Sequence, residues 1–484
     1  MGDDTKSGAQ LGRSFLFGSM YLGIASWVTS ALSFAINIVL ARVLGPEVLG
    51  FYAFVFSVNE ILNMIGAFSL GLAVIQAPRE SQRLYDTAVA ISAALGLIGL
   101  VAAAVIAPVL AVYRSGLAAW FLVILALKRV MELVARIPLS QLERSLRFGT
   151  AAAIGLATAN LPNLCAVILA LLGAGAWSLL ARDVLVGALA LLLAVWLSGY
   201  RFRRDVDRPT ARQLMSFASP FFLSRALEIA MERVDRLVIG ASLGDVKLGF
   251  YNQARTLSET GLIVARPLTR LTFNLYSRLQ EESTRLSRAY GIVNYFLVRM
   301  IFSGAVTLLI FPRETILLLL GEEWLGAAPI LGWLAVYAAL LPLQQNMVVL
   351  LYARKAMRQS VWMRVIQLGI FLPGLVVGVV LDDTIVVAGS LLFVTCLGIS
   401  LASYFNREIV GAELIGVLLG PSLCVVGTVL SFLFAVPAGV LDSLPTWILP
   451  FLPPVVYAVL LLAIERARLF REFGYLRRIA RGSP

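Results

Sequence analysis

The sequence predicts an all-α integral membrane protein with about 14 transmembrane helices: two pseudo-symmetric six-helix bundles and two further C-terminal helices. Hydrophobic residues make up 60% of the 484 residues and charged residues only 14%, and the mean hydropathy is +0.88. Long apolar stretches recur along the chain, and one short motif is repeated near its middle. A soluble domain cannot bury so much apolar surface, so most of the chain is expected to lie in lipid.

Roughly 20 apolar residues are needed to cross the hydrocarbon core of a bilayer. The first apolar stretch begins near Ser14 and is too long for the core of a signal peptide, so we expect a retained first span. The predicted spans are residues 14–41, 49–76, 86–112, 117–140, 149–172, 176–199, 214–241, 250–277, 290–311, 327–352, 360–381, 384–405, 413–436 and 445–464.

The basic residues of the loops predict the topology. With the N-terminus inside, the cytoplasmic segments hold 25 cations, and the opposite side holds only Arg42, Arg114, Lys247 and Arg313. Cytoplasmic loops of membrane proteins carry such an excess of Lys and Arg. An error of one span would invert every later loop, so the asymmetry supports an even number of spans with both termini in the cytoplasm.

The motif LGPEVLGFY (residues 44–52) returns as LGDVKLGFY (residues 243–251), with six of nine residues identical at an offset of 199. Both copies lie between long apolar stretches, which indicates two halves built on one plan. Six spans per half is an even number, so the halves share one orientation in the membrane. The predicted parts are an N-terminal tail, an N-lobe, a basic cytoplasmic linker, a C-lobe, spans 13 and 14, and a basic cytoplasmic tail: residues 1–13, 14–200, 201–213, 214–406, 407–464 and 465–484.

The composition excludes several classes of function. The chain has no histidine, which rules out His-based catalytic triads, metal sites and proton relays. Cys165, Cys396 and Cys424 lie in apolar runs without disulfide or zinc spacing, so we expect no metal and no cofactor. The net charge of +12 comes from short basic clusters between spans, which is typical of cytoplasmic loops, so no nucleic-acid partner is expected.

Eleven cations that are not counted with the loops fall inside the predicted spans, together with seven acids away from the span ends. Each would cost about 2.5–3.5 kcal/mol if it faced lipid, so these groups should face water or one another. Helical spacing places them on stripes, within an arc of about 60° on span 8 and about 100° on span 7. The stripes are Arg255, Glu259, Arg266 and Arg270 on span 8; Arg225, Glu228, Glu232, Asp235 and Arg236 on span 7; Lys128, Glu132 and Arg136, with Arg129 beside them, on span 4; and Asn59, Glu60 and Asn63 on span 2.

Each stripe has a structural interpretation beside the functional one. Span 7 carries three cations and three acids and can be an ion-pair ladder. Lys128 and Arg136 can extend their charged ends toward the interface. Span 8 has three cations and one acid, which favours ligand binding. Arg182 with its neighbour Asp183, and Arg299, are interpreted as local structure.

Clustered guanidinium groups are suited to phosphate and pyrophosphate. A lipid-linked pyrophosphate would need a cationic cavity between two lobes, open sideways for its lipid tail. The predicted substrate-binding residues are Arg255, Arg266, Arg270, Arg225, Arg129, Lys128 and Arg136. Two drives stay open: the membrane potential, worth about 2.3 kcal/mol per charge per 100 mV, and binding of H⁺ or Na⁺ by Glu228, Glu232, Glu259 or Glu60.

Three segments carry a family resemblance: INIVLARVLGPEVLGFYAFVFSVNEIL (residues 36–62), VDRLVIGASLGDVKLGFYNQARTLSE (residues 234–259) and LLLGEEWLGAAPILGWLA (residues 318–335). They resemble oligosaccharide flippases of the polysaccharide transporter (Wzx-like) family, within the multidrug/oligosaccharidyl-lipid/polysaccharide (MOP) exporter superfamily, and the likeness covers nearly the whole chain. The resemblance implies a MOP/MATE-like fold with two six-helix bundles in a V around a central cavity, and alternating access.

The same resemblance implies a substrate and a location. The substrate would be an undecaprenyl-diphosphate-linked glycan, flipped from the inner to the outer leaflet of a bacterial cytoplasmic membrane. Membrane lipid and the machinery of polysaccharide assembly are the other implied partners.

Two rival classes stay open at the level of sequence. Another exporter of the superfamily, for lipid II or for drugs, would share the spans, although drug exporters need few arginines in the cavity. A membrane polysaccharide polymerase or ligase usually needs a sizeable extracytoplasmic loop, and the predicted outer loops are short. We therefore expect a transporter and no enzyme.

Overall fold

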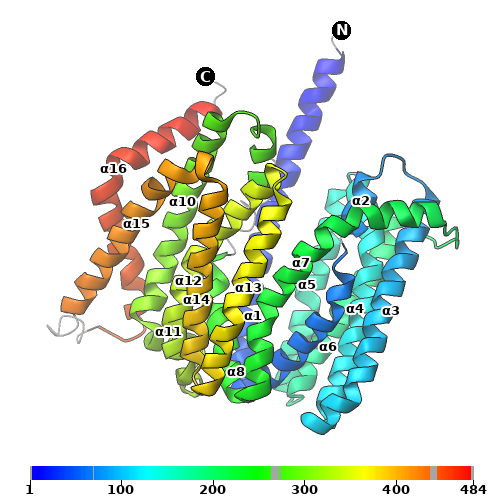
Figure 1. The fold of residues 1–484 in the computed structure, drawn as a ribbon, viewed down its shortest axis with the longest axis horizontal. Coiled ribbons are helices and arrows are strands. Elements are labelled where there is room, and N and C mark those ends of the chain that lie inside the picture. The colour runs from blue at the N-terminus through cyan, green and yellow to red at the C-terminus, as the bar shows by residue number, and fades with distance from the viewer. Residues whose placement is uncertain (1–2, 69, 263–271, 274, 436–443, 481–484) are drawn as a thin grey trace. The chain divides into compact units, whose positions relative to one another are not determined.

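The computed structural model describes residues 3–68, 70–262, 272–273, 275–435 and 444–480. All regular secondary structure in these residues is helical (Figure 1), which confirms the predicted all-α class. The chain divides into two compact units, unit 1 (Met1–Gly249) and unit 2 (Phe250–Pro484).

Unit 1 is a bundle in which α4 packs against α3 and α6, α5 packs against α6 and α1, and α7 packs against α1. Its elements are α1 (Asp3–Leu62), the 3₁₀ helix η1 (Asn63–Ala67), α2 (Leu70–Gln76), α3 (Gln82–Tyr113), α4 (Gly116–Arg144), α5 (Phe148–Leu171), α6 (Ala176–Ser198), α7 (Arg208–Ser242) and the start of α8 (Asp245–Ser258).

Helix α1 runs through the first two predicted spans and is broken between them. Gly45 has φ 73° and ψ 173°, outside the helical region, and Pro46 follows it. Glycine tolerates a positive φ without a steric penalty, and proline cannot continue the hydrogen-bond ladder of the preceding turn. The chain therefore leaves the helix inside the first copy of the repeat. The second span was predicted to reach residue 76; α1 ends at Leu62, and η1 and α2 cover the rest.

Three helices of unit 1 begin at side-chain caps that the sequence supplies. Ser81, Ser115 and Asp207 each accept a hydrogen bond from the backbone N–H three residues later, at 3.1, 3.2 and 3.0 Å, at the starts of α3, α4 and α7. Such caps satisfy one of the N–H groups that a helix start leaves unpaired. Asp207 also closes the α6–α7 loop (residues 199–207).

In unit 2, α12 packs against α10 and α14, α13 against α14, and α15 and α16 against α10 and each other. Tyr290, Met347, Met363 and Tyr457 lie in its buried core. Its elements after α8 are the 3₁₀ helix η2 (Glu259–Gly261), α10 (Ser283–Ile310), α11 (Pro312–Leu319), η3 (Glu322–Ala327), α12 (Ala328–Ala353), α13 (Met357–Val380), α14 (Thr384–Phe405), α15 (Arg407–Ala435), η4 (Leu449–Phe451) and α16 (Leu452–Ala480).

Among the described residues, ten helices are long and apolar enough to cross a membrane. They correspond to predicted spans 3, 5, 6 and 9–14, and to a segment, Thr29–Leu62, that joins parts of the first two. Helices α4 and α7, with 29 and 35 residues, exceed the roughly 20 residues of a crossing. They are not among the ten, because their ionisable residues lower the hydropathy. The count of 14 spans and the two six-helix bundles stay predictions.

Candidate functional site

Unit 1 gathers charged side chains around the ring of Phe56 in α1. The ammonium group of Lys128 in α4 lies 5.7 Å from the ring centroid, and the guanidinium group of Arg233 in α7 lies 5.2 Å from it. An aromatic face attracts cations at such distances, and more strongly where water is excluded. We call the surrounding residues the unit-1 charged cluster: Tyr52, Phe56 and Glu60 of α1, Lys128, Arg129 and Glu132 of α4, Arg182 and Asp183 of α6, and Arg225, Glu228, Glu232 and Arg233 of α7.

One part of the unit-1 charged cluster is fully paired and ties α6 to α1. Arg182 Nε lies 3.0 Å from Asp183 Oδ1, and the hydroxyl of Tyr52 donates a hydrogen bond to Asp183 Oδ2. Tyr52 and Asp183 are both buried. Every charged group here has a partner, which fits the interpretation of Arg182 and Asp183 as local structure.

In α4, two cations share a single carboxylate. The Oε1 and Oε2 atoms of Glu132 lie 3.0 Å from Lys128 Nζ and 3.2 Å from Arg129 Nη1. The Nε atom of Arg129 is buried and has no hydrogen-bond partner among the described residues. A buried N–H left without an acceptor costs about 1–3 kcal/mol, and more when the group is charged. Arg129 therefore has hydrogen-bonding capacity to offer a bound anion.

In α7, Arg225 and Glu228 form one of the ion pairs that the predicted ladder requires. Arg225 Nη1 lies 2.7 Å from Glu228 Oε2, and Glu60 of α1 and Glu232 also act electrostatically on Arg225. Arg225 is thus surrounded by carboxylates within unit 1. Its side chain remains 49% exposed, so protein encloses this group only in part.

Arg233 differs from Arg225 because no carboxylate pairs with it among the described residues. Its guanidinium instead lies over the Phe56 ring, and its buried Nε atom has no acceptor in the described part of the chain. The charged stripe predicted for span 7 did not include Arg233, because Arg233 lies about 60° beyond the arc of the other charged side chains. The sequence does hold a sign of this role, because helical spacing directs Arg233 away from the acids of its own helix.

Arg136, the last predicted binding residue of α4, lies apart from Phe56. Its guanidinium is 3.9 Å from Glu143, and its side chain is 54% exposed. Its aliphatic stem lies against Gly71 of α2, where a Cβ atom would come within 3.1 Å of it. The structure therefore does not bring Arg136 together with Lys128 and Arg129.

In unit 2, the predicted trio of Arg255, Arg266 and Arg270 can be placed only in part, because Arg266 and Arg270 lie outside the described residues. Arg255 is buried, and its Nε donates a hydrogen bond to Glu259 Oε1 at 2.8 Å. Its Nη2 donates to the hydroxyl of Tyr337 at 3.4 Å. Arg255 is thus engaged by a carboxylate one helical turn away and by a tyrosine of α12.

Unit 2 also holds a buried ion pair that the sequence reading did not find. Arg299 of α10 contacts both oxygens of Glu465 of α16 at 2.5 Å. Arg299 Nη1 also donates to the carbonyls of Tyr295 at 2.7 Å and Val417 at 3.3 Å. The ion pair joins α10 to α16, and the bond to Val417 joins α10 to α15, so Arg299 has a structural role in anchoring α16.

The geometry supports anion binding in unit 1 more directly than in the described part of unit 2. The unit-1 charged cluster holds five cations and five acids, so it has no net charge. Its distinguishing groups are the unpaired Nε–H donors of Arg129 and Arg233, near Lys128 and an aromatic ring. Guanidinium donors of this kind match phosphate oxygens.

The fold and the charged cluster first define a class: a multi-pass α-helical membrane protein that holds ionisable groups inside a helix bundle. Residues 39–329 match the polysaccharide biosynthesis protein family, and the chain belongs to this family. The resemblance predicted from the repeat-bearing segments is therefore confirmed.

Curated relatives agree with this assignment. The chain is 29% identical to the succinoglycan biosynthesis transport protein ExoT of Rhizobium meliloti (strain 1021) over 323 residues, which cover 65% of this chain and 64% of ExoT. It is 25% identical to the teichuronic acid biosynthesis protein TuaB of Bacillus subtilis (strain 168) over 130 residues, 27% of each chain. The match thus spans just under two thirds of the length of ExoT.

Solved structures show the same fold. The lipid II flippase MurJ in an inward closed conformation matches with a TM-score of 0.71 at 11% identity, over 93% of this chain and 100% of that one. An inward-facing multidrug resistance MATE family transporter of the MOP superfamily matches with a TM-score of 0.60 at 15% identity, over 81% and 99%. At these identities the likeness concerns the fold alone.

Proposed function

We propose that this protein is a flippase that translocates a polyprenyl-diphosphate-linked oligosaccharide across the bacterial cytoplasmic membrane by alternating access. Membership of the polysaccharide biosynthesis family and the MOP fold support this proposal. The name of ExoT, a biosynthesis transport protein, supports transport over catalysis. An undecaprenyl chain and a glycan repeat unit are the proposed parts of this substrate, and membership of the family supports them.

One observation carries the proposal at the level of residues: the guanidinium of Arg233 has a buried, unpaired Nε–H and no carboxylate partner among the described residues. A diphosphate oxygen would satisfy this donor. Lys128 lies on the neighbouring helix α4 beside the same aromatic ring. Arg129 follows Lys128 in the chain and has a buried Nε–H without a partner among the described residues. In the proposed site these three cations hold the diphosphate, while Arg266 and Arg270 remain predicted members from the C-lobe.

The neutrality of the unit-1 charged cluster suggests the drive. A diphosphate that enters a neutral cluster adds negative charge, and protonation of an acid in the cluster offsets it. Glu228, which pairs with Arg225 at 2.7 Å, and Glu232 are the proposed proton acceptors, because a proton on Glu228 would release Arg225 for the anion. Glu259 in unit 2 pairs with Arg255 in the same way. Na⁺ is the alternative ion at these carboxylates.

The proposed topology has 14 spans in two six-helix lobes and a C-terminal pair, with both termini in the cytoplasm. The asymmetry of loop cations supports it. Labelling of single cysteines in the loops from each side of the membrane tests this topology. A cysteine in the 201–213 linker that is labelled only from outside would contradict it.

The substrate site is tested in proteoliposomes that contain a fluorescent polyprenyl-diphosphate oligosaccharide, with a membrane-impermeant quencher reporting flipping. A charge-assisted hydrogen bond is worth about 1.5–3 kcal/mol, so Arg233→Gln should slow flipping about tenfold or more. Arg136→Gln makes the same change in charge away from Phe56 and should leave the rate within about twofold. Full flipping by Arg233→Gln, with normal protein recovery, would remove Arg233 from the site.

The same vesicles distinguish the rival functions. Lipid II carries the same diphosphate on a different glycan, so it serves as a competitor. Stronger competition by lipid II than by the oligosaccharide lipid would reassign the substrate within the superfamily. Incorporation of labelled sugar into polymer would instead indicate a polymerase or ligase.

A further inference from the structure

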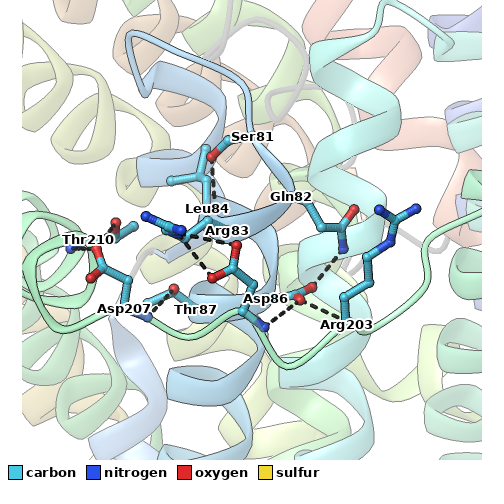
Figure 2. Close-up of polar contacts among 10 residues, drawn as sticks. Ser81, Gln82, Arg83, Leu84, Asp86, Thr87, Arg203, Asp207 and Thr210 are labelled. Carbon is cyan, nitrogen blue, oxygen red and sulfur yellow. Dashed lines mark hydrogen bonds and ion pairs between the residues drawn. The ribbon is translucent and has the colours of Figure 1, made fainter.

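The α6–α7 loop is held in one conformation by a buried carboxylate at the start of α3 (Figure 2). Asp86 accepts a hydrogen bond from Gln82 Nε2 at 2.7 Å and another from the Tyr200 hydroxyl at 2.7 Å. It also accepts from the backbone N–H groups of Arg203 at 2.9 Å and Asp205 at 3.1 Å. Burial, and then the hydrogen bond to Asp86, raise the pKa of the Tyr200 hydroxyl, which therefore remains a donor.

Between the two loop N–H groups lies a residue in an uncommon conformation. Arg204 has φ 62°, a left-handed value that costs a non-glycine residue about 1 kcal/mol. The backbone N–H groups on either side of such a residue form a concave nest for an anion, and here the anion is the carboxylate of Asp86. Further clamps are the ion pair of Arg83 with Asp205 at 3.1 Å and the hydrogen bond from Asp207 N to Thr87 Oγ1 at 3.2 Å.

The fixed backbone turns apolar and basic side chains outward. Phe202 and Val206 are 48% and 53% exposed. Five arginines of the loop and the first turns of α7 are exposed, and none has an ion-pair partner among the described residues: Arg201, Arg203, Arg204, Arg208 and Arg212. In contrast, the two acids of the loop are engaged, one with Arg83 and one as the helix cap.

The loop lies next to a surface that is suited to lipid. On α6, Leu192 is 65% exposed and Trp196 is 75% exposed. Tryptophan is enriched at the level of the lipid headgroups. Phe202 follows Trp196 by six residues, just beyond the end of α6, so the loop is placed at headgroup level. Beside it, a hollow of about 330 Å³ is lined by apolar side chains together with polar ones that include Arg79, Thr210 and Gln213.

We propose that this surface, which we call the loop anchor (the α6–α7 loop with Arg208 and Arg212), binds the headgroups of anionic phospholipids. The arginines meet the lipid phosphates, and Phe202 and Val206 enter the interface. Basic side chains next to a membrane are attracted by its negative surface potential, by about fivefold in affinity for each Lys or Arg. The hydrogen bonds to Asp86 fix the backbone that carries the arginines before lipid binds. A backbone that is already ordered reduces the entropic cost of binding.

Lipid binding to the full-length protein in neutral detergent tests the loop anchor. The probes are dansyl-labelled phosphatidylglycerol and its phosphatidylcholine analogue, and the signal is energy transfer from tryptophan to dansyl. A triple variant of the loop anchor should bind phosphatidylglycerol about a hundredfold more weakly. It combines Arg203→Gln, Arg204→Gln and Arg208→Gln. Phe202→Ser should weaken both lipids by about tenfold and leave their ratio unchanged. A triple variant in unit 2, Arg278→Gln, Lys355→Gln and Arg358→Gln, is the charge-matched control. It removes three other exposed cations that have no ion-pair partner within the described ranges.

Three results would overturn the loop anchor. Equal loss of affinity in the two triple variants would mean that only the net charge matters. Equal binding of phosphatidylcholine by the wild type would remove the headgroup preference. Displacement of phosphatidylglycerol by soluble pyrophosphate would reassign the surface to the substrate headgroup. The readout is binding alone, so it is independent of whether the protein flips a glycan lipid.

Discussion

Gly50 packs against the backbone carbonyl of Asp245, and Gly249 packs against the backbone carbonyl of Pro46. In the sequence repeat, Gly249 is the counterpart of Gly50 and Asp245 is the counterpart of Pro46. Each glycine therefore contacts the same position of the other copy, and the contact is reciprocal. A Cβ atom on either glycine would overlap the facing carbonyl. The two copies of the repeat therefore meet as a pseudo-two-fold pair, and glycine stands where the backbones come closest.

The first prediction concerns this contact. Gly50→Ala should lower the free energy of unfolding by about 1–3 kcal/mol, because the new methyl group forces two backbones apart. Thermal unfolding in detergent, followed by tryptophan fluorescence, measures the change. Gly155→Ala is the control, since nothing lies within 4 Å of a Cβ atom at Gly155 and alanine favours the helix there. Equal stability of Gly50→Ala and the wild type would mean that the two backbones separate without cost.

The sequence predicted the helical fold, the repeat and the presence of charges in α4 and α7, because these depend on hydropathy and spacing along one chain segment. The sharing of Glu132 by Lys128 and Arg129 also follows from spacings of four and three residues. Arg233 was missed because its partner is an aromatic ring on another helix. The pairing of Arg299 with Glu465 joins positions 166 residues apart, and no local pattern could indicate it.

The second prediction tests the shared carboxylate. Side chains of Lys128 and Glu132 are 9% and 22% exposed. Loss of one partner from a buried ion pair costs about 3–5 kcal/mol, so Glu132→Gln should strongly destabilise unit 1. Chemical unfolding in mixed micelles measures this change. Glu143→Gln, at the weaker 3.9 Å contact with Arg136, should change stability by no more than about 1 kcal/mol.

The third prediction concerns the anchor of α16. Arg299→Leu leaves the buried carboxylate of Glu465 without its cation, and should cost about 3–5 kcal/mol. The double variant Arg299→Leu with Glu465→Leu removes both charges, so it should recover at least half of that loss. The double-mutant cycle is read from unfolding free energies. Additive losses in the double variant would show that the two side chains do not act as a pair.

The fourth prediction concerns Asp207, which caps α7 and closes the α6–α7 loop. Hydrogen bonds from the Thr210 hydroxyl and backbone N–H lower the pKa of the Asp207 carboxyl. A folded-state pKa below the unfolded value of about 3.9 means that the carboxylate stabilises the fold above that pH, and that this stability is lost as pH falls through the folded pKa. Asp207→Ala should therefore lower the unfolding temperature at neutral pH, and the difference from wild type should shrink in acid. Asp207→Asn keeps a helix cap without a titrating group, so the unfolding temperature of this variant should lack the acid-dependent step. A step of the same size in Asp207→Asn would assign the acid dependence to another carboxyl group.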